Sequence, residues 1–594
     1  MTKNLPEPIV FPTKYNQEEA SELDTIIKRD VSSESQTYLS DYPTVYIIDH
    51  AGPNQKPQYT VYVGETNDIQ RRTLQHLDSD PVVRQDWRQL KHTANASMFI
   101  IGHRHFNKSL TLDIENRMMH YLSGVSTVIR LNNRRDNAQK DYYTADEMVP
   151  IFNKIWRKLH KIKPDLFPLQ RIVEDSALFK ASPFYKLNAE QLRAKDQILN
   201  VVQEYLNTGK KNQLILVKGE AGAGKTVLMS NIFYALANLK NGERPLSLAM
   251  MVNQNEQQKV YEQIVKKLAI PNAKVEKVVT FIRKHPPLTE NSESKNAVDI
   301  AFVDEAHLLL TQNNQAFTKK YGNNELLDII KRAKVTIAVY DDHQVLGYNQ
   351  IIENDDQKKI QQYHPYTITL RNQMRIHASA AMLNWLRNIV DNQTITKAPQ
   401  DKNYDLRIFD HPAAMQEAIN KKANEDGKNG ISRMIATFDW DYSSQSKNND
   451  DPDGLWQVSA DNWHMPWNKQ LSPAKDDKRQ ISGVKYSDLS WAEQPHTVRE
   501  IGSTYTVQGF DLNYAGVVIG PSVKYRNGKI VFDPSESKDK KVYQRRSMHD
   551  GSKQEYGTTL IENTFNVLMT RGVNGLYLYA VDPALQAALK KAVQ

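Results

Sequence analysis

The run GEAGAGKT at residues 219–226 has the residue types and spacing that hold the phosphates of a nucleotide. It follows an apolar, strand-like stretch, QLILVK, and precedes a helix-like stretch, VLMSNIFYAL. Three glycines, Gly219, Gly222 and Gly224, allow the backbone to curve so that its N–H groups can surround phosphate oxygens. Lys225 would reach the β- and γ-phosphates, and the Thr226 hydroxyl would ligate Mg²⁺. The run therefore predicts a site for ATP and Mg²⁺.

An acidic pair ends another apolar stretch, IAFVDEAHLLL at residues 300–310. Asp304 and Glu305 would be costly to bury at the end of a strand unless a cation or a water network receives them. Asp304 is expected to hold Mg²⁺ through water, and Glu305 to orient and deprotonate the attacking water. Together, the two motifs predict hydrolysis of a nucleoside triphosphate.

A second set of residues with chemical potential lies in the first 135 positions. The stretches VYII and YVG predict a β-hairpin with one tyrosine in each strand, Tyr46 and Tyr62. A helix-like segment follows directly. Arg72 and His76 are four residues apart on it, so they share one face of the helix.

A carboxylate and an asparagine complete this set. TLDIENRMMHYL predicts an amphipathic helix whose apolar stripe is interrupted by Glu115, and a carboxylate in such a stripe requires a cation. Asn132 and Asn133 follow in the stretch LNNRR. These residue types suit hydrolysis of a phosphodiester at a single divalent metal, Mg²⁺ or Mn²⁺. Arg72 would steady the phosphate, Glu115 would hold the metal, and a tyrosine hydroxyl would orient or deprotonate water.

The elements that must position these residues indicate an α/β protein of several domains. In residues 186–370, strand-like runs such as LSLAMMV and VTIAVYD alternate with helical segments, which is typical of a parallel sheet. The expected parts, from the N-terminus, are a mobile or loosely packed arm (1–40), a small α/β domain (41–135), a helical connector (136–185), a first parallel-sheet lobe (186–370) and a second lobe (371–594) with an insertion around 395–500.

Composition sets broad limits on the function. The chain has 594 residues, of which 40% are hydrophobic and 25% charged, as in ordinary globular proteins. It has no cysteine, which excludes disulfides and cysteine zinc sites and fits a reducing compartment. Because the N-terminus lacks the apolar run of a signal peptide, and no stretch approaches the roughly 18 apolar residues of a membrane span, we expect a cytoplasmic protein without a membrane partner. The net charge of +8 favours a polyanionic partner only weakly, because it is spread over a long chain.

Further motifs occur in a fixed order around the glycine-rich run. They are LNAEQ (187–191) before it, and YDDHQ (340–344), LRNQMR (370–375), STYTVQGFDL (503–512) and NVLMTRG (566–572) after it. This order, over residues 186–594, resembles the superfamily 1 helicases and translocases. It resembles more closely the bacterial DUF2075 proteins, whose ATPase domain is shared with the Schlafen group. The resemblance implies two RecA-like lobes, with Arg375 and Arg571 reaching the transferring phosphate from the second lobe when the lobes close.

The same resemblance implies roles for other matching residues. Gln191 would contact the adenine edge of ATP. Asp341 and Gln344 would couple the γ-phosphate to the nucleic-acid groove. Gln508 and Gly509 would link the nucleotide state to strand binding.

Residues 41–135 resemble the GIY-YIG nuclease family. Its motif positions are occupied by Tyr46, Tyr62, Gly64, Arg72, His76 and Glu115, with Asn132 or Asn133 at its late asparagine. Two positions depart from the family pattern: Thr44-Val45 replaces the first glycine of the motif, and Glu65 stands where a basic residue often follows the second. Three interpretations stay open: an active nuclease, a nuclease fold that binds DNA without cutting it, and a small α/β domain whose arginine and histidine form salt links.

Together, the resemblances imply an ATP-dependent helicase or translocase fused to a metal-dependent endonuclease, with nucleic acid as partner and DNA expected rather than RNA. They imply a role in antiviral defence against foreign DNA from phages or plasmids, or in processing aberrant DNA. One alternative is a repair or recombination helicase whose nuclease-like module only targets structured DNA. Another is an ATP-switched nucleic-acid sensor that clamps without unwinding.

Two polar regions lie outside these motifs. Residues 438–491 contain five of the eight tryptophans, which are Trp440, Trp456, Trp463, Trp467 and Trp491. These rings could stack on unpaired bases, but packing within the second lobe is the favoured interpretation. The run PSESKDKKVYQRRSMHDGSKQ, residues 534–554, predicts a solvated loop.

Overall fold

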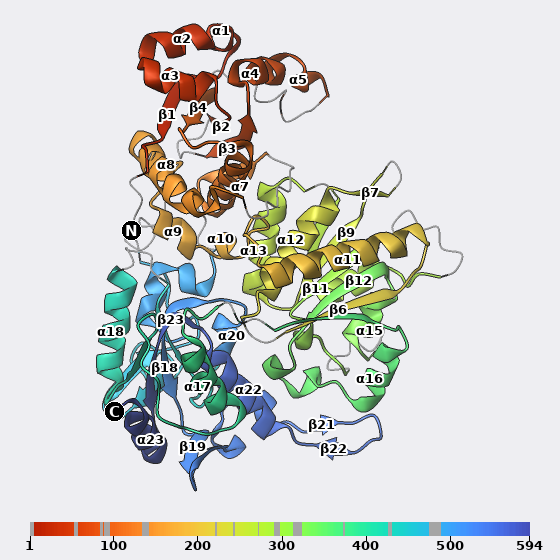
Figure 1. Ribbon diagram of the computed structural model, residues 1–594. Helices are drawn as coiled ribbons and strands as arrows, with labels where there is room; N and C mark the ends of the chain where they lie inside the picture. Colours follow the sequence, from red (N-terminus) through yellow and green to blue (C-terminus); the bar gives the residue numbers. More distant parts are fainter. Residues whose placement is uncertain are drawn as a thin grey trace. The chain divides into compact units, whose positions relative to one another are not determined.

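The chain forms two compact units in the computed structural model, one built mainly from residues 1–186 and the other from residue 187 onward (Figure 1). The structure describes residues 5–52, 58–83, 87, 96–132, 142–219, 222–241, 244–270, 272–289, 298–312, 323–371, 373, 375–425, 431–474 and 489–594. None of the helices within these ranges combines the length and the apolar character needed to cross a membrane.

The first unit contains a five-stranded sheet of order β1-β4-β2-β3-β5. The predicted hairpin is confirmed as β2 and β3, which pair antiparallel and place Tyr46 opposite Gly64. The strands are β1 (Ile9–Lys14), β2 (Thr44–Ala51), β3 (Tyr59–Thr66), β4 (Ala96–Gly102) and β5 (Val128–Leu131). The helices are α1 (Gln17–Ser21), α2 (Leu23–Asp30), α3 (Ser33–Ser40), α4 (Ile69–Asp78), α5 (Asp80–Val83), α7 (Lys108–Gly124), α8 (Met148–Ile162), α9 (Gln170–Asp175) and α10 (Ala177–Lys180).

Residues 9–40, expected to be a mobile or loosely packed arm, are part of this unit's sheet and core. β1 pairs with β4 along its whole length. Leu23, Ile27 and Leu39 of the helices α2 and α3 are buried in one apolar cluster with Tyr46 and Ile48 of β2. These helices are too short to show a clear period in the sequence, and the strand that pairs with β1 lies far along the chain.

The expected helical connector packs into a second core of the same unit. α8 buries one face, including Phe152, Ile155 and Trp156, against residues of α7 such as Tyr121. The basic segment KIWRKLHKIK therefore directs its tryptophan inward, as expected for an amphipathic helix.

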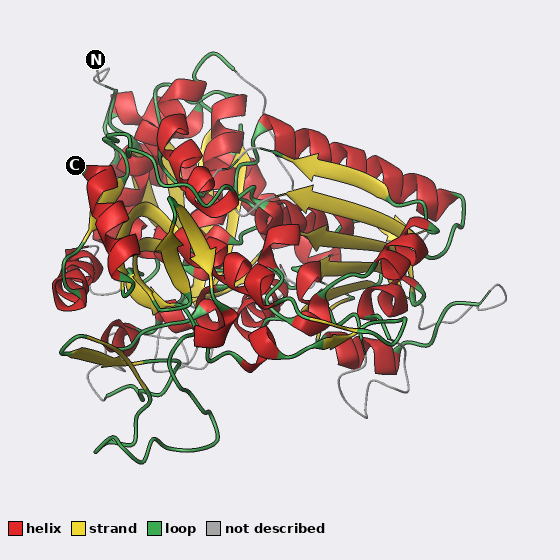
Figure 2. Ribbon diagram, turned by 90° about the horizontal axis from the view of Figure 1, so that it is seen from below, coloured by secondary structure: helices red, strands yellow, loops and turns green. Residues whose placement is uncertain are grey.

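In the second unit, the first lobe contains a six-stranded sheet of order β10-β9-β11-β12-β6-β13 in which every neighbouring pair is parallel. Helices flank the strands (Figure 2). This arrangement confirms the parallel sheet predicted from the alternation of strand-like and helical runs. The elements are α11 (Ala189–Asn207), β6 (Gln213–Gly219), α12 (Lys225–Ala237), β7 (Lys240–Asn241), β8 (Arg244–Pro245), β9 (Leu248–Val252), α13 (Asn255–Lys267), β10 (Ala273–Glu276), α14 (Val278–Lys284), β11 (Val298–Asp304), α15 (Glu325–Ile330), β12 (Ala333–Tyr340), α16 (Asn354–Gln361) and β13 (Tyr366–Leu370).

The second lobe contains a parallel sheet of order β14-β23-β18-β15. β14 and β15 belong to this sheet, so the part of the expected insertion (around 395–500) that precedes Ala436 contributes strands to the lobe. Only the part after Ala436 departs from the sheet. The elements are α17 (Ala380–Asp391), β14 (Asp405–Ile408), α18 (Pro412–Glu425), β15 (Arg433–Ala436), β16 (Gln457–Ala460), β17 (Trp463–Pro466), α20 (Thr504–Val507), β18 (Leu512–Ile519), β19 (Val523–Arg526), β20 (Lys529–Phe532), α21 (Lys540–Tyr543), β21 (Arg546–Ser547), β22 (Lys553–Gln554), α22 (Gly557–Met569), β23 (Gly572–Ala580) and α23 (Pro583–Val593).

The tryptophan-rich segment packs onto the second lobe, which confirms the favoured interpretation. Trp467 and Trp491 are fully buried, and Trp440, Trp456 and Trp463 are partly buried against the same lobe's core. Each of the five indole N–H groups donates a hydrogen bond to a protein oxygen. These rings are therefore structural in the described conformation.

The polar run 534–554 is not wholly a solvated loop, so that prediction was wrong for its most basic part. It contains the short hairpin of β21 and β22, which lies beside α16 of the first lobe (Figure 1). The Arg546 side chain is 0% exposed and forms an ion pair with Glu353 at 2.9 Å. It also donates to the Thr311 hydroxyl at 3.0 Å and to the Tyr348 carbonyl at 2.9 Å. Oxygen atoms of the first lobe thus pair with the Arg546 charge, which the local sequence predicted to be exposed to solvent.

Candidate functional site

The glycine-rich run joins β6 to α12 and has a backbone suited to phosphate binding. Gly222 and Gly224 have φ values of +87° and +72°, in the left-handed region that residues with a Cβ rarely adopt. A Cβ added at Gly222 would lie 2.9 Å from the Cβ of Arg375, so the second lobe packs directly against the loop. The Gln191 amide, predicted to contact adenine, donates to the Gly224 carbonyl at 3.3 Å. It therefore also helps to hold the loop.

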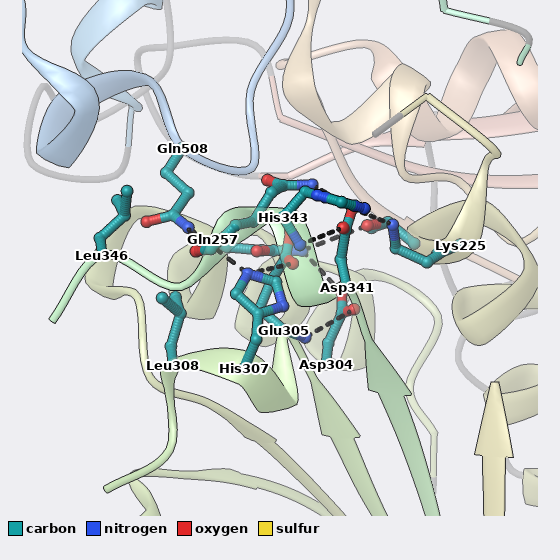
Figure 3. Close-up of polar contacts among 12 residues, drawn as sticks. Lys225, Gln257, Asp304, Glu305, His307, Leu308, Asp341, His343, Leu346 and Gln508 are labelled. Atoms are coloured by element: carbon teal, nitrogen blue, oxygen red, sulfur yellow. Dashed lines mark hydrogen bonds and ion pairs between the residues drawn. The ribbon is translucent and has the colours of Figure 1, made fainter. Parts of the chain in front are cut away.

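Lys225, the first residue of α12, contacts oxygen atoms of the first lobe. Its Nζ donates to the Gly219 carbonyl at 2.6 Å and forms an ion pair with Asp341 Oδ2 at 2.9 Å (Figure 3). Burial, the largest single cause, raises the pKa of Asp341, but the Lys225 ammonium, His307 and the hydrogen bonds from Lys225 and Gln344 together outweigh burial, so the pKa is lowered. A phosphate that binds Lys225 must share or replace this carboxylate.

The two predicted Mg²⁺ ligands are brought together at the end of β11. The Gln257 amide nitrogen lies 2.6 Å from Asp304 Oδ2 and 3.4 Å from the Thr226 hydroxyl. The Tyr261 hydroxyl donates to the same Asp304 oxygen at 2.7 Å. Burial and the neighbouring Glu305 raise the pKa of Asp304 to about 7. This donor set fits a hard divalent cation, which would favour the carboxylate over the acid.

Glu305 occupies a strained position next to Asp304. Its φ is +52°, which is unusual for a residue with a side chain, and such strain concentrates at functional sites. Its Oε2 lies 3.3 Å from His307 Nε2, and Gln508 of the second lobe lies 3.4 Å from the same nitrogen (Figure 3). Burial lowers the pKa of His307, which favours its neutral form. The residue predicted to orient water is therefore connected to the second lobe.

Arg571 crosses from the second lobe to this network. Its guanidinium donates to Gln344 Oε1 at 3.2 Å, and the Gln344 amide donates to Asp341 Oδ2 at 2.6 Å. Burial and the nearby Arg375 charge lower the pKa of Arg571 to about 9. A buried cation of this kind is stabilised by an anion such as the γ-phosphate.

Arg375, the other predicted arginine, forms an ion pair with Asp511 at 2.5 Å. Its side chain is only 15% exposed and lies against the glycine-rich run. Both arginines therefore lie at the junction of the lobes, and each already has a protein partner.

In the first unit, the two tyrosines and the histidine form one buried cluster. The Tyr46 hydroxyl and His76 Nε2 are 2.7 Å apart, and the rings of Tyr46 and Tyr62 are 5.9 Å apart between centroids. A Cβ added at Gly64 would lie 2.5 Å from the Tyr46 ring, so the glycine allows the tyrosine to cross β3. The hairpin register and the helix α4 thus bring together residues that the sequence only suggested were neighbours.

Arg72 and Glu115 border this cluster from α4 and α7. Burial raises the pKa of Tyr46 well above its usual value, and the Arg72 charge acts in the opposite direction. Glu115 is 1% exposed, and its charge contributes to the raised pKa of Tyr62, whose main cause is burial. The described part of the chain holds no group of three or more histidine and carboxylate side chains arranged to bind a metal. A single buried carboxylate nevertheless fits a cation that keeps water ligands and takes others from a substrate phosphate.

The asparagines are less directly connected to the cluster. Asn132 is buried at the end of β5, where its side-chain oxygen accepts a hydrogen bond from Arg130 at 2.9 Å. Asn133 lies outside the described residues. Glu65, at the position where a basic residue is common, is paired with Lys108 at 2.5 Å, so a lysine from another element lies there.

Three residues at these sites were not predicted from the sequence. Gln257 and Tyr261 are four residues apart on α13 and belong to no motif in the sequence. Asp80 begins α5 and lies 2.5 Å from His76 Nδ1. The i, i+4 spacing that linked Arg72 to His76 could also have indicated Asp80.

Residues 212–582 match the family described as Schlafen group 3, DNA/RNA helicase domain. The chain belongs to this family. The match includes most of both lobes and every predicted nucleotide-site residue except Gln191. It confirms the Schlafen-group part of the predicted resemblance and a helicase-like P-loop ATPase domain. It begins after residues 41–135, so the nuclease, with the DUF2075 and defence assignments, stays a prediction.

Individual proteins are also similar to this chain. The uncharacterized protein YPL245W of Saccharomyces cerevisiae is 29% identical over 477 residues, which cover 74% of this chain and 98% of the yeast protein. Among solved structures, Pif1 helicase from Candida albicans is 12% identical with a TM-score of 0.28, over 68% of this chain and 98% of that one. A structure of two Pif1 helicases at forked double-stranded DNA is 9% identical with a TM-score of 0.26, over 67% of this chain and 94% of that one.

Proposed function

We propose that this protein is an ATP-dependent nucleic-acid helicase or translocase joined to a metal-dependent endonuclease, and that it acts on foreign or aberrant DNA. The observation that carries the motor part is the chain of contacts Lys225–Asp341–Gln344–Arg571. It runs from the phosphate-binding loop to the second lobe inside a Schlafen group 3 helicase domain. Such a path couples nucleotide contacts to the arrangement of the lobes.

In the motor, Lys225 would exchange Asp341 for the β/γ-phosphates, and Gln344 would transmit this change to Arg571. Mg²⁺, when bound, would offset the charge of the phosphates. Thr226 and Asp304 would hold the Mg²⁺, and their contacts with Gln257 would be replaced. Glu305 would orient the attacking water, and Arg375 and Arg571 would stabilise the charge that develops on the transferring phosphoryl group.

The endonuclease part rests on the convergence of Tyr46, Tyr62, Arg72, His76 and Glu115 from β2, β3, α4 and α7. A divalent metal, Mg²⁺ or Mn²⁺, would offset charge on the leaving oxygen when bound. Glu115 would hold it, Arg72 would steady the phosphate, and the tyrosine–histidine pair would handle the proton of the attacking water. The resemblance of residues 41–135 to the GIY-YIG family supports the same roles.

One experiment separates this proposal from its alternatives. The full chain is incubated with linear, circular, single- and double-stranded DNA and RNA, with and without ATP and Mg²⁺. Strand displacement, ATP hydrolysis and single-turnover cleavage are then measured. ATP-dependent strand displacement with metal-dependent cleavage of DNA is the expected result. Displacement without cleavage would leave a repair helicase with a targeting module, and ATP-dependent binding with neither activity would indicate a clamping sensor.

A further inference from the structure

Asp80 is a charged residue of the first unit that has no role in the proposed chemistry so far. Asp80 is the first residue of α5, and its side chain is about one-fifth exposed. Its carboxylate lies 2.5 Å from Nδ1 of the fully buried His76. The same histidine lies 2.7 Å from the Tyr46 hydroxyl through its other nitrogen. The three side chains therefore form a continuous line from the unit's surface to the tyrosine.

The hydrogen-bonding chemistry of this line fixes where the protons lie. A carboxylate can only accept, so the single proton of a neutral imidazole is placed on Nδ1, and Nε2 presents a lone pair. The Tyr46 hydroxyl then donates to Nε2. The Trp87 ring stacks on the imidazole at 3.7 Å between centroids with an interplanar angle of 12°, which prevents the histidine ring from turning away.

We propose that Asp80 is the positioning residue of a Tyr46–His76–Asp80 proton relay in the endonuclease. The inference rests on the proposed function of the first unit. When water attacks the phosphodiester, its oxygen forms the new P–O bond and the bond to the leaving oxygen breaks. The water proton passes to the Tyr46 oxygen as the Tyr46 proton passes to His76 Nε2, and solvent protonates the leaving oxygen. Asp80 holds the tautomer that can accept and stabilises the imidazolium that results.

The surroundings of the relay agree with this role. Burial raises the pKa of Tyr46, so its hydroxyl needs an adjacent base to lose a proton near neutral pH. The other titratable groups around the relay are Tyr62 on β3, Arg72 on α4, Glu115 on α7 beside Tyr62, and Tyr15, whose pKa is raised by burial and by Asp80. Asp80 is the group in contact with His76 Nδ1.

The test compares Asp80→Asn with Asp78→Asn in the full chain. Asp78 is exposed near the end of α4, so its variant makes the same charge change outside the relay. Single-turnover cleavage of end-labelled DNA is measured with Mg²⁺ or Mn²⁺ from pH 5 to 9, together with DNA affinity. Asp80→Asn should lower the maximal cleavage rate by about 100-fold, within the range for general acid–base catalysis, without weakening DNA binding. The acidic limb of its pH–rate profile should move to lower pH, because the imidazolium loses its counter-charge.

Two further measurements separate a relay from a structural role. Asp80→Glu keeps the carboxylate and should restore part of the rate with a wild-type pH profile. If Asp80→Asn were simply misfolded, its rate would fall but the acidic limb of its pH–rate profile would not move. Selective ¹⁵N labelling of histidine should show the Nδ1–H tautomer for His76 in the wild type and its loss in Asp80→Asn. If Asp80→Asn cleaves DNA with the rate and the pH profile of the wild type, the relay is overturned but the endonuclease is not. A wild-type protein that cleaves none of the substrates would overturn the endonuclease and the relay with it.

Discussion

The residues of the two candidate sites are held in different ways. In the first unit, Tyr46, His76 and Asp80 are linked by direct contacts of 2.7 and 2.5 Å within one compact body. The nucleotide-site residues come from two lobes, and burial shifts the pKa values of some of them away from their usual range. The pKa of Asp304 is raised to about 7 and that of Arg571 is lowered to about 9.

This difference indicates how each site depends on its ligand. Mg²⁺ and ATP would supply a cation beside Asp304 and an anion beside Arg571, so binding relieves the cost of both buried charges. In the first unit, the contacts of His76 with Tyr46 and Asp80 are present without a ligand. We therefore expect the nucleotide site to depend on ATP and Mg²⁺ to offset its buried charges, whereas the contacts among Tyr46, His76 and Asp80 should form before the substrate binds.

The largest effect is expected for Lys225→Ala. Removal of the ammonium eliminates the charge that contacts the β/γ-phosphates and should lower nucleic-acid-stimulated ATP hydrolysis by at least about 100-fold. Lys210→Ala, at a half-exposed lysine away from the loop, is the control and should hydrolyse ATP normally. ATP turnover at the wild-type rate in Lys225→Ala would contradict the motor assignment.

Glu115→Gln should break the first-unit site without touching the second. A carboxamide is a poor ligand for a hard divalent cation, so metal-dependent cleavage should fall by about 100-fold or more while ATP hydrolysis persists. Glu34→Gln, at an exposed position of α3, serves as the matched control. If Glu115→Gln cuts as well as wild type, the metal ligand is elsewhere or the cleavage comes from a contaminant.

Glu305→Gln should show whether the two sites work together. The variant keeps Lys225 and Thr226 and should bind ATP, but hydrolysis should stall because the water-orienting carboxylate is lost. If translocation feeds the nuclease, cleavage of long end-labelled DNA should become confined to sites near initial binding. Arg72→Ala should hydrolyse ATP without cutting.

The cleavage maps of Glu305→Gln, Arg72→Ala and wild type must be compared at one salt concentration, because phosphate contacts make affinity salt-dependent. An identical map and rate for Glu305→Gln and wild type would mean that the ATPase does not drive the nuclease. That result would favour the sensor that clamps without unwinding.

The smallest effect on activity is expected for Arg546→Ala, which breaks a contact between the lobes away from both sites. The variant leaves Glu353 buried without its partner, a change that typically costs about 3–5 kcal/mol. Its neighbour Arg545 is 63% exposed, and Arg545→Ala should change stability by less than about 0.5 kcal/mol. Urea unfolding of both variants is the measurement. Equal midpoints would show that the buried ion pair does not stabilise the contact between the lobes.

Local spacing was sufficient to predict much of how the residues of both candidate sites are arranged. The glycine-rich run, the acidic pair at the end of β11, the hairpin with its two tyrosines and the Arg72–His76 pair each depend on a few neighbouring positions. Strand and helix geometry acts over that range, so the sequence indicates which of these side chains lie close together. The alternation of strand-like and helical segments likewise predicted the parallel sheet of the first lobe.

Only the tertiary structure decided which distant groups satisfy the buried charges. Arg546 lies in a polar run, yet Glu353, 193 positions earlier, makes its burial possible. Gln257 and Tyr261 contact Asp304 because the parallel register brings the end of β9 beside the end of β11. Residues 9–40 join a core because β4, almost ninety positions later, pairs with β1. A sequence records the cost of burying each group, but only the folded chain shows which remote partner offsets that cost.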